Sequence, residues 1–331
     1  MARSDLLLNL VRAGRVGDQA LLKRTAEALA AEERANSHHL LAERIEAALR
    51  LDGIVNSLAA PDEQAERFVH QSVPRRRLDQ LILDDPTVAL CLELIEEHQR
   101  VDLLRSHNLE PRHRILLTGP PGNGKTSLAE AIACEMLLPL YTVRYEGVIA
   151  SYLGETASRV SRLLDFVRSR HCVLFFDEFD AIAKERGDPH DTGEVKRVVS
   201  SLLLQIDALP THVVVITATN HPELLDRAVW RRFQVRVELT QPNRRQRERF
   251  ISVLRTPFAD SAGFQVSTIA DRLAGLSYAE IEDFVTDLQR KYVLALPDAN
   301  FTNILRTSLA QWGVRLRQRP SKKRHVEIDG E

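Results

Sequence analysis

The apolar positions of the first 60 residues follow the period of an α-helix. They recur at steps of three and four residues in two stretches: Leu22, Thr25 and Leu29, then Leu41, Ile45, Ala48 and Leu49. Glu and Arg fill the positions between them, so each stretch predicts an amphipathic helix. We expect a helical N-terminal arm over residues 1–60, with its two helices joined near residues 36–39.

The next stretch has a different composition. Residues 61–85 contain Pro61 and Pro74, the basic run Arg75-Arg-Arg77 and few apolar side chains. Prolines and sparse hydrophobic positions are typical of connecting segments. The stretch predicts a linker, and a solvated face is the ordinary role of so short a basic run.

From residue 86 onward, continuous apolar runs alternate with helical patterns. Five strands are expected, at residues 114–118, 140–143, 172–176, 213–217 and 233–239, of which 172–176 is apolar throughout. Runs without polar interruption are typical of strands covered on both faces, and their alternation with helices favours a parallel sheet. The predicted fold class is therefore α/β: a parallel five-stranded sheet flanked by helices over residues 86–242.

After residue 242 the pattern is helical only. Helices are expected at residues 244–255, 266–273 and 279–296, which indicates a small helical domain over residues 243–314. Residues 315–331 are rich in Arg and Lys and predict a disordered basic tail.

Composition narrows the class of protein. The 331 residues are 44% hydrophobic and 27% charged, which suits two or three globular units. A net charge of −1 gives no field for binding nucleic acid or an anionic membrane over the whole chain. Three widely spaced cysteines offer neither a disulfide framework nor a C-x-x-C metal site. No leader and no membrane-length apolar run is recognisable, so a cytoplasmic protein is expected.

A glycine-rich loop follows the first predicted strand. Its sequence, Gly119-Pro-Pro-Gly-Asn-Gly-Lys-Thr126, precedes a helix-forming segment. Glycines let backbone N–H groups curl around phosphate oxygens, the lysine reaches the β- and γ-phosphates, and the Thr126 hydroxyl is a ligand for Mg²⁺. The predicted nucleotide-binding residues are Gly119, Pro120, Pro121, Gly122, Asn123, Gly124, Lys125, Thr126 and Ser127.

Polar residues end two later strands. Asp177 and Glu178 follow the apolar run at 172–176, and Asn220 follows the run at 213–217. In parallel sheets, ligands bind at the carboxyl ends of the strands. We expect Asp177 to hold Mg²⁺, Glu178 to accept a proton from the attacking water, and Asn220 to hydrogen-bond the water or the γ-phosphate.

An arginine pair follows in Trp230-Arg-Arg-Phe233. Phosphoryl transfer spreads negative charge over the γ-phosphoryl oxygens, and an arginine finger stabilises it. Arg231 and Arg232 are both candidates for that role.

Together these motifs resemble the AAA+ ATPases. The stretch from Thr217 to Phe233 is similar to the second region of homology that marks the AAA subgroup, and the resemblance covers residues 86–296. It implies a P-loop NTPase-type fold with a helical lid, ATP as the nucleotide, Mg²⁺ as the metal and ATP hydrolysis as the reaction. It makes Lys125 the phosphate contact, Glu178 the base and Asn220 the first sensor.

The resemblance also implies an assembly. Fingers in this family reach the nucleotide of a neighbouring subunit, so a homo-oligomeric ring, usually a hexamer, is expected. The chain lacks the glycine that separates the two arginines in other members, so the choice between Arg231 and Arg232 stays open. In the predicted lid, Ala279 occupies the place of a small residue near the nucleotide.

Tyr152 and Leu153, followed by Gly154, are similar to the pore loop with which AAA unfoldases contact a polypeptide. The favoured hypothesis is therefore an ATP-driven protein remodeller, unfoldase or translocase. The chain has no H-E-x-x-H motif or nucleophile elbow, so any degradation would need a separate peptidase. Two rivals stay open. One is a nucleic-acid-linked ATPase of the loader or transposition-helper type, supported by the basic tail and by Arg75-Arg-Arg77, and the other is a nucleotide-gated scaffold.

Overall fold

A computed structural model of the chain describes residues 19–35, 67–145, 153–180, 202–225, 227–254 and 265–317. The chain divides into two units, residues 1–63 and 64–331. In the first, helix α2 spans Gln19–Ala35, and Thr25 and Leu29 are buried on it, as their spacing predicts. The second helix expected in the arm lies outside the described residues.

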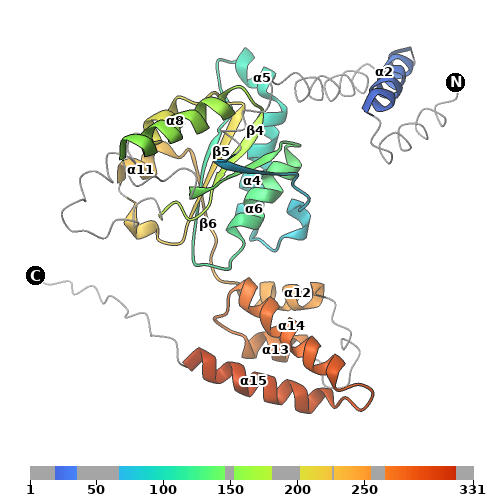
Figure 1. The fold of residues 1–331 in the computed structure, drawn as a ribbon. Helices are drawn as coiled ribbons and strands as arrows, with labels where there is room; N and C mark the ends of the chain where they lie inside the picture. The colour runs from blue at the N-terminus through green and yellow to red at the C-terminus, as the bar shows by residue number, and fades with distance from the viewer. Residues whose placement is uncertain are drawn as a thin grey trace, which may run out of the picture. The chain divides into compact units, whose positions relative to one another are not determined.

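The second unit contains a six-stranded sheet in the order β1-β3-β4-β5-β2-β6 (Figure 1). Its strands are β1 (Val69–Ser72), β2 (Arg114–Thr118), β3 (Leu140–Val143), β4 (Cys172–Phe176), β5 (Val213–Thr219) and β6 (Val235–Glu238). Strands β3, β4, β5, β2 and β6, which are neighbours in that order, all run parallel. Leu174 pairs with Val215 and Leu117 with Ala218. The predicted parallel α/β sheet is confirmed.

The sixth strand was not expected. β1 lies within the stretch that the sequence indicates as a linker, and it pairs antiparallel with β3, Val69 opposite Val143. Phe68 and Val69 are both buried in the core. Of the four residues of β1, only Val69 is buried. So short a segment shows no alternation of apolar and polar positions, so the sequence pattern did not predict a strand there.

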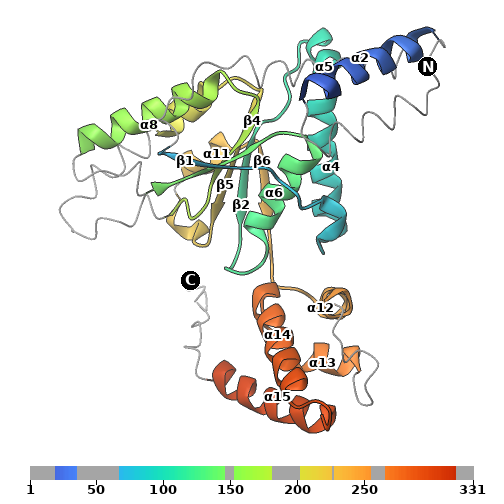
Figure 2. The ribbon, with the colours of Figure 1, turned by 45° about the vertical axis from the view of Figure 1, so that its right-hand side comes forward.

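Helices cover both faces of the sheet (Figures 1 and 2). One core gathers α8 (Leu153–Arg168) and the side chains of β2, β4 and β5 that point to its face, among them Leu116, Leu174 and Val215. The other gathers α4 (Asp85–Gln99), α6 (Lys125–Glu135) and the alternate side chains, among them Ile115 and Val214. The central strands are thus buried on both sides, as continuous apolar runs require.

Shorter elements complete this part of the chain: 3₁₀ turns η1 (Leu78–Gln80) and η2 (Pro222–Leu224), and helices α5 (Val101–Ser106) and α11 (Arg227–Arg232). Residues 202–207 are also helical.

Four helices follow the sheet: α12 (Arg244–Val253), α13 (Val266–Arg272), α14 (Tyr278–Leu294) and α15 (Phe301–Arg317). They share a separate apolar core that includes Ile269, Ile281 and Phe284, and Phe284 meets Trp312 edge to face at 5.6 Å. α15 extends three residues into the stretch predicted as a tail. None of the described helices is long and apolar enough to cross a membrane.

Candidate nucleotide-binding and hydrolytic site

Three neighbouring strands deliver the predicted site residues to one edge of the sheet. β4, β5 and β2 are adjacent and parallel. Asp177 follows β4, Asn220 follows β5, and the glycine-rich loop follows β2. Because parallel strands end at the same edge, residues up to about a hundred positions apart in the sequence line one cavity of about 580 Å³.

The glycine-rich loop has the backbone that its composition predicts. Gly119, Gly122 and Gly124 all have positive φ, with Gly124 at 86° as the N-cap of α6. A Cβ on Gly119 would lie 2.1 Å from the Leu239 carbonyl oxygen, so no other residue fits there without moving the chain. The loop therefore leads directly into the positive end of a helix, an arrangement that favours a bound anion.

Lys125 is buried at the first turn of α6. Its Nζ donates to the carbonyl oxygens of Gly119 at 2.7 Å and Pro120 at 3.0 Å, so the ammonium is held inside the loop. Burial lowers the pKa of Lys125, while the charges of Asp177, Asp180 and Glu178 oppose that change. The side chain is a cation at the place where the loop is shaped for phosphate.

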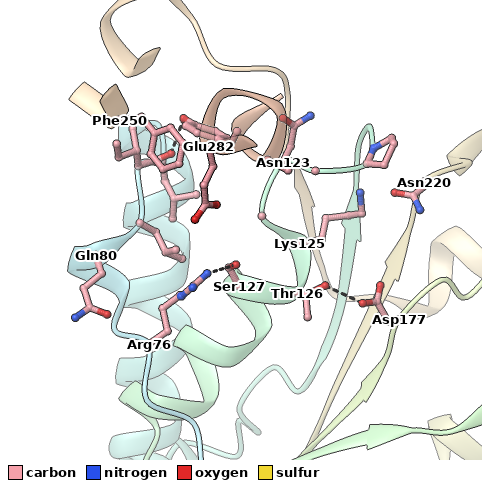
Figure 3. A pocket seen from close by; sticks show the side chains of 18 of the residues that line it. Arg76, Gln80, Asn123, Lys125, Thr126, Ser127, Asp177, Asn220, Phe250 and Glu282 are labelled. Atoms are coloured by element: carbon pink, nitrogen blue, oxygen red, sulfur yellow. Dashed lines mark hydrogen bonds between the residues drawn. The ribbon is translucent and has the colours of Figure 1, made fainter. Parts of the chain in front are cut away.

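Thr126 and Asp177 are in direct contact. The Thr126 hydroxyl donates to Asp177 Oδ2 at 2.7 Å (Figure 3). A hydroxyl and a carboxylate are oxygen ligands of the kind that Mg²⁺ takes together with phosphate oxygens and water. The two side chains therefore fit a magnesium ion shared with a nucleotide.

Glu178 adopts a left-handed backbone conformation, with φ of 49°. Its N–H donates to Asp177 Oδ1 at 2.9 Å, and its own side chain is exposed along the cavity. A non-glycine residue at positive φ carries strain of a kind that gathers at functional sites. At this turn the Asp177 carboxylate contacts Thr126, whereas the next carboxylate, that of Glu178, is exposed along the cavity.

Asn220 reaches the cavity from the end of β5, and its Oδ1 has no hydrogen-bond partner among the described residues. The residue before it is fixed by two hydrogen bonds. The Thr219 hydroxyl donates to Asp180 Oδ1 at 2.9 Å and accepts from the His221 N–H at 3.0 Å. Asp180 thereby ties the turn after β4 to the turn that carries Asn220.

The helical domain closes another side of the cavity. The Ala279 N–H donates to the Gly122 carbonyl oxygen at 3.0 Å, and a Cβ on Gly122 would lie 2.8 Å from Ser277 Oγ. Ser277 is also the N-cap of α14, in a capping box with Glu280. The lid thus meets the phosphate-binding loop at Ala279, where the sequence places a small residue.

The rest of the cavity wall was not predicted from the sequence. It comes from the supposed linker and from the lid: Arg76, Gln80, Leu81, Ile82, Leu83, Phe250, Tyr278 and Glu282. Tyr278 joins the two segments, because its hydroxyl donates to the Ile82 carbonyl oxygen at 2.9 Å. The short apolar run at 81–83 within a mostly polar stretch was the one signal of this wall in the sequence.

The arginine pair on α11 lies outside this cavity and splits into two environments. Arg232 is half-buried and forms an ion pair with Asp207. Arg231 is exposed and has no ion pair among the residues that the structure describes. Neither arginine lines the cavity of its own chain.

Of the remaining predicted residues, Gly119 and Pro120 form the start of the loop, and Pro121, Asn123 and Ser127 line the cavity. Asn123 is buried and its Nδ2 donates to the Pro120 carbonyl oxygen at 3.4 Å. Leu153 is the first residue of α8, but its side chain and all of Tyr152 lie outside the described residues.

Comparison with known proteins places these motifs in a family. Residues 115–241 match the model of the ATPase family associated with various cellular activities. The AAA family ATPase y4kL of Sinorhizobium fredii, an uncharacterised protein, is 35% identical over 89% of this chain and 90% of its own length. A cell division cycle protein 48 homologue of Archaeoglobus fulgidus is 36% identical over 55% of this chain, which spans only 25% of that protein.

Two further comparisons agree. The peroxisomal ATPase pex6 of Schizosaccharomyces pombe is 43% identical over 39% of this chain and 14% of its own length. The crystal structure of the FIGL-1 AAA domain with ADP shares the fold, with a TM-score of 0.59 and 21% identity over 80% of this chain and 93% of that one. With a relative matched over nearly its full length and the motifs of a nucleotide site at one sheet edge, this chain belongs to the AAA family of ATPases.

Proposed function

We propose that this chain hydrolyses ATP at the cavity beside the glycine-rich loop, and that it uses the hydrolysis to remodel, unfold or translocate polypeptides as an oligomeric ring. The observation that carries the first part is the contact between Thr126 and Asp177 directly beside the buried Lys125. The residues that would bind phosphate and Mg²⁺ meet there: the loop follows β2, Lys125 and Thr126 begin α6, and Asp177 follows β4.

The positions of the side chains support a distinct role for each residue. Lys125 would bind the β- and γ-phosphates, and Thr126 with Asp177 would hold Mg²⁺. That ion, when bound, neutralises charge that develops on the phosphate oxygens. Glu178 would accept the proton of the attacking water, since its carboxylate faces the cavity without contacting Thr126. Asn220 would orient that water through its free amide oxygen.

A ring is proposed because neither candidate finger lines the nucleotide cavity of its own chain. Arg231 and Arg232 end α11 outside the cavity that holds Lys125 and Asp177. The arginine that adds to Lys125 in stabilising the γ-phosphoryl group would then come from a second copy. Six copies are the proposed number, on the family resemblance.

The polypeptide substrate is proposed from Tyr152 and Leu153, on the resemblance of these residues to a pore loop. A tyrosine ring with a phenol tip suits contact with a peptide backbone of any sequence. Among the relatives is an ATP-dependent zinc metalloprotease, FtsH 3 of Sphaerobacter thermophilus, 35% identical over 52% of this chain, which spans 36% of that protein. This chain carries no H-E-x-x-H motif, so any cleavage would be performed by a separate peptidase.

The nucleic-acid alternative loses part of its support. Within the basic run, Arg76 lines the nucleotide cavity and Arg77 pairs with Glu135 of α6, so the run does not present three arginines to a nucleic-acid backbone. Residues 318–331 of the basic tail lie outside the described residues, so they support neither the protein-remodelling nor the nucleic-acid hypothesis.

ATPase rates test the proposal. We expect an unfolded protein to raise the rate, and duplex or single-stranded DNA to leave it unchanged. Tyr152→Ala should remove the stimulation by unfolded protein and keep the basal rate, which serves as the internal control. Stimulation by DNA and not by protein would replace this proposal with the loader hypothesis.

A further inference from the structure

Arg76 lies in the wall of the nucleotide cavity, although it belongs to a stretch that the sequence indicates as a solvated linker. Its guanidinium points into the cavity and Nη1 donates to the Ser127 hydroxyl (Figure 3). Ser127 Oγ is its one side-chain partner among the described residues. Most of the five guanidinium N–H donors therefore remain available to a ligand.

The backbone around Arg76 is fixed to the phosphate-loop helix. The N–H groups of Arg75 and Arg76 both donate to Glu130 Oε1, at 3.1 and 3.3 Å, and the Leu78 N–H donates to Glu135 Oε1 at 3.3 Å. These bonds hold the segment along α6. The position of the guanidinium at the first turn of α6 is thus set by the main chain as well as by its own side chain.

The helix geometry shows which end of a nucleotide Arg76 would meet. Successive helical residues point about 100° apart, from 3.6 residues per turn. Thr126 points to Asp177, toward the β- and γ-phosphate end, whereas Ser127 points to Arg76. Beyond Arg76 the wall is formed by Leu81, Ile82 and Leu83, which suit the uncharged nucleoside. In a nucleotide bound in this direction, the α-phosphate would lie between these two ends.

From this placement we infer that Arg76 is a further nucleotide-binding residue, which donates hydrogen bonds to the α-phosphate oxygens of ATP and ADP. The inference rests on the proposed nucleotide site and adds a second cation to it, opposite Lys125. Guanidinium is always charged and matches phosphate oxygens with two parallel donors, so binding in this way depends on the phosphate and not on the base.

Calorimetric titration of the full chain with Mg²⁺ and either ADP or adenosine tests the inference. Arg76→Gln should weaken ADP binding by about tenfold, the usual effect of losing one hydrogen bond to a charged group. Adenosine binding should not change, because adenosine has no phosphate. Arg76→Lys should recover part of the ADP affinity, since it keeps the charge and loses the paired donors.

Arg75→Gln is the matched control. The backbone N–H of Arg75 donates to the same Glu130 side chain, but the side chain of Arg75 does not line the cavity. Its ADP and adenosine affinities should equal those of the wild type. The ratio of ADP to adenosine affinity within one variant does not depend on the folded fraction, so partial unfolding cannot imitate the result.

Two results would overturn the role of Arg76: unchanged ADP affinity in Arg76→Gln, or equal losses for ADP and adenosine, which would mean that Arg76 only supports the wall. A wild-type chain that does not bind ADP at all would instead refute the nucleotide site itself. The two failures are therefore distinguishable.

Discussion

Arg232 forms an ion pair with Asp207, and the other oxygen of the same carboxylate pairs with Arg114. All three side chains are partly buried within one chain. Arg231, the preceding residue on α11, is exposed and free of ion pairs among the described residues. The structure thus separates two arginines that the sequence leaves equivalent, and we propose Arg231 as the finger for a neighbouring copy.

The separation predicts different outcomes for two alanine variants. Arg231→Ala should lower the ATPase rate of the assembled protein by about 10³-fold or more, the usual effect of a missing finger, and leave the melting temperature unchanged. Arg232→Ala should lower the free energy of unfolding by about 1–2 kcal/mol, between the values for exposed and buried ion pairs. Thermal melting and ATPase rates measured on both variants check this. If Arg232→Ala alone abolished hydrolysis in a fully stable protein, the roles would be reversed.

Glu178→Gln should stop hydrolysis and preserve binding. The amide keeps the shape of the side chain but cannot accept the proton, so the rate should fall by about 10²- to 10⁴-fold. ATP affinity should be close to that of the wild type, because Thr126, Asp177 and Lys125 are untouched. Single-turnover hydrolysis and ATP binding are the two measurements. Full turnover by this variant would remove Glu178 from its role.

Thr219 is a positioning residue for Asn220. Thr219→Val removes the hydroxyl that joins Asp180 to the His221 N–H, so Asn220 should lose its fixed orientation. We expect kcat to fall while the Kd for ADP is unchanged. Thr217→Val is the matched control: this hydroxyl is equally buried on β5 but donates to the Ile115 carbonyl oxygen instead. Equal effects of the two variants on kcat would mean that only stability was altered.

His113 predicts a pH dependence of stability. Burial, assisted by the charge of Arg114, lowers its pKa to about 4. An unfolded histidine titrates near pH 6.5, so the unfolded chain binds a proton first and stability falls as the pH drops from about 6.5 toward 4. Between pH 7 and pH 5 this histidine should cost about 2 kcal/mol of unfolding free energy.

His113→Phe provides the comparison, because it keeps a buried ring and removes the titration. Urea unfolding at both pH values should show a smaller loss in the variant by about that amount. Carboxylates titrate alike in both proteins and cancel in the difference. Identical pH profiles would mean that His113 is protonated in the folded protein or that another group governs the profile.

The sequence was sufficient for the elements that follow strong local rules. Short stretches rich in apolar residues predicted β2 to β6, and the glycine-rich loop predicted the backbone at Gly119, Gly122 and Gly124. Asp177 and Asn220 were assigned to one cavity because parallel strands end at the same edge. These inferences needed only periodicity and the topology of a parallel sheet.

What the sequence did not reveal depends on tertiary contacts. β1 is a strand because β3 has a free edge to pair with, and its four residues carry no period of their own. Arg76 becomes part of the site because Glu130 fixes its backbone, a contact across 54 residues. The different states of Arg231 and Arg232 depend on Asp207, which no spacing rule connects to them.

The most direct test of a hydrolytic site shared between subunits is to mix two inactive variants. Glu178→Gln retains Arg231 but lacks the base, and Arg231→Ala retains the base but lacks the finger. Co-assembled in one oligomer, an intact Arg231 from one chain should complete the site of its neighbour, and the mixture should hydrolyse ATP although neither variant does so alone. A mixture that forms oligomers but stays as inactive as its components would contradict a site completed by a second copy.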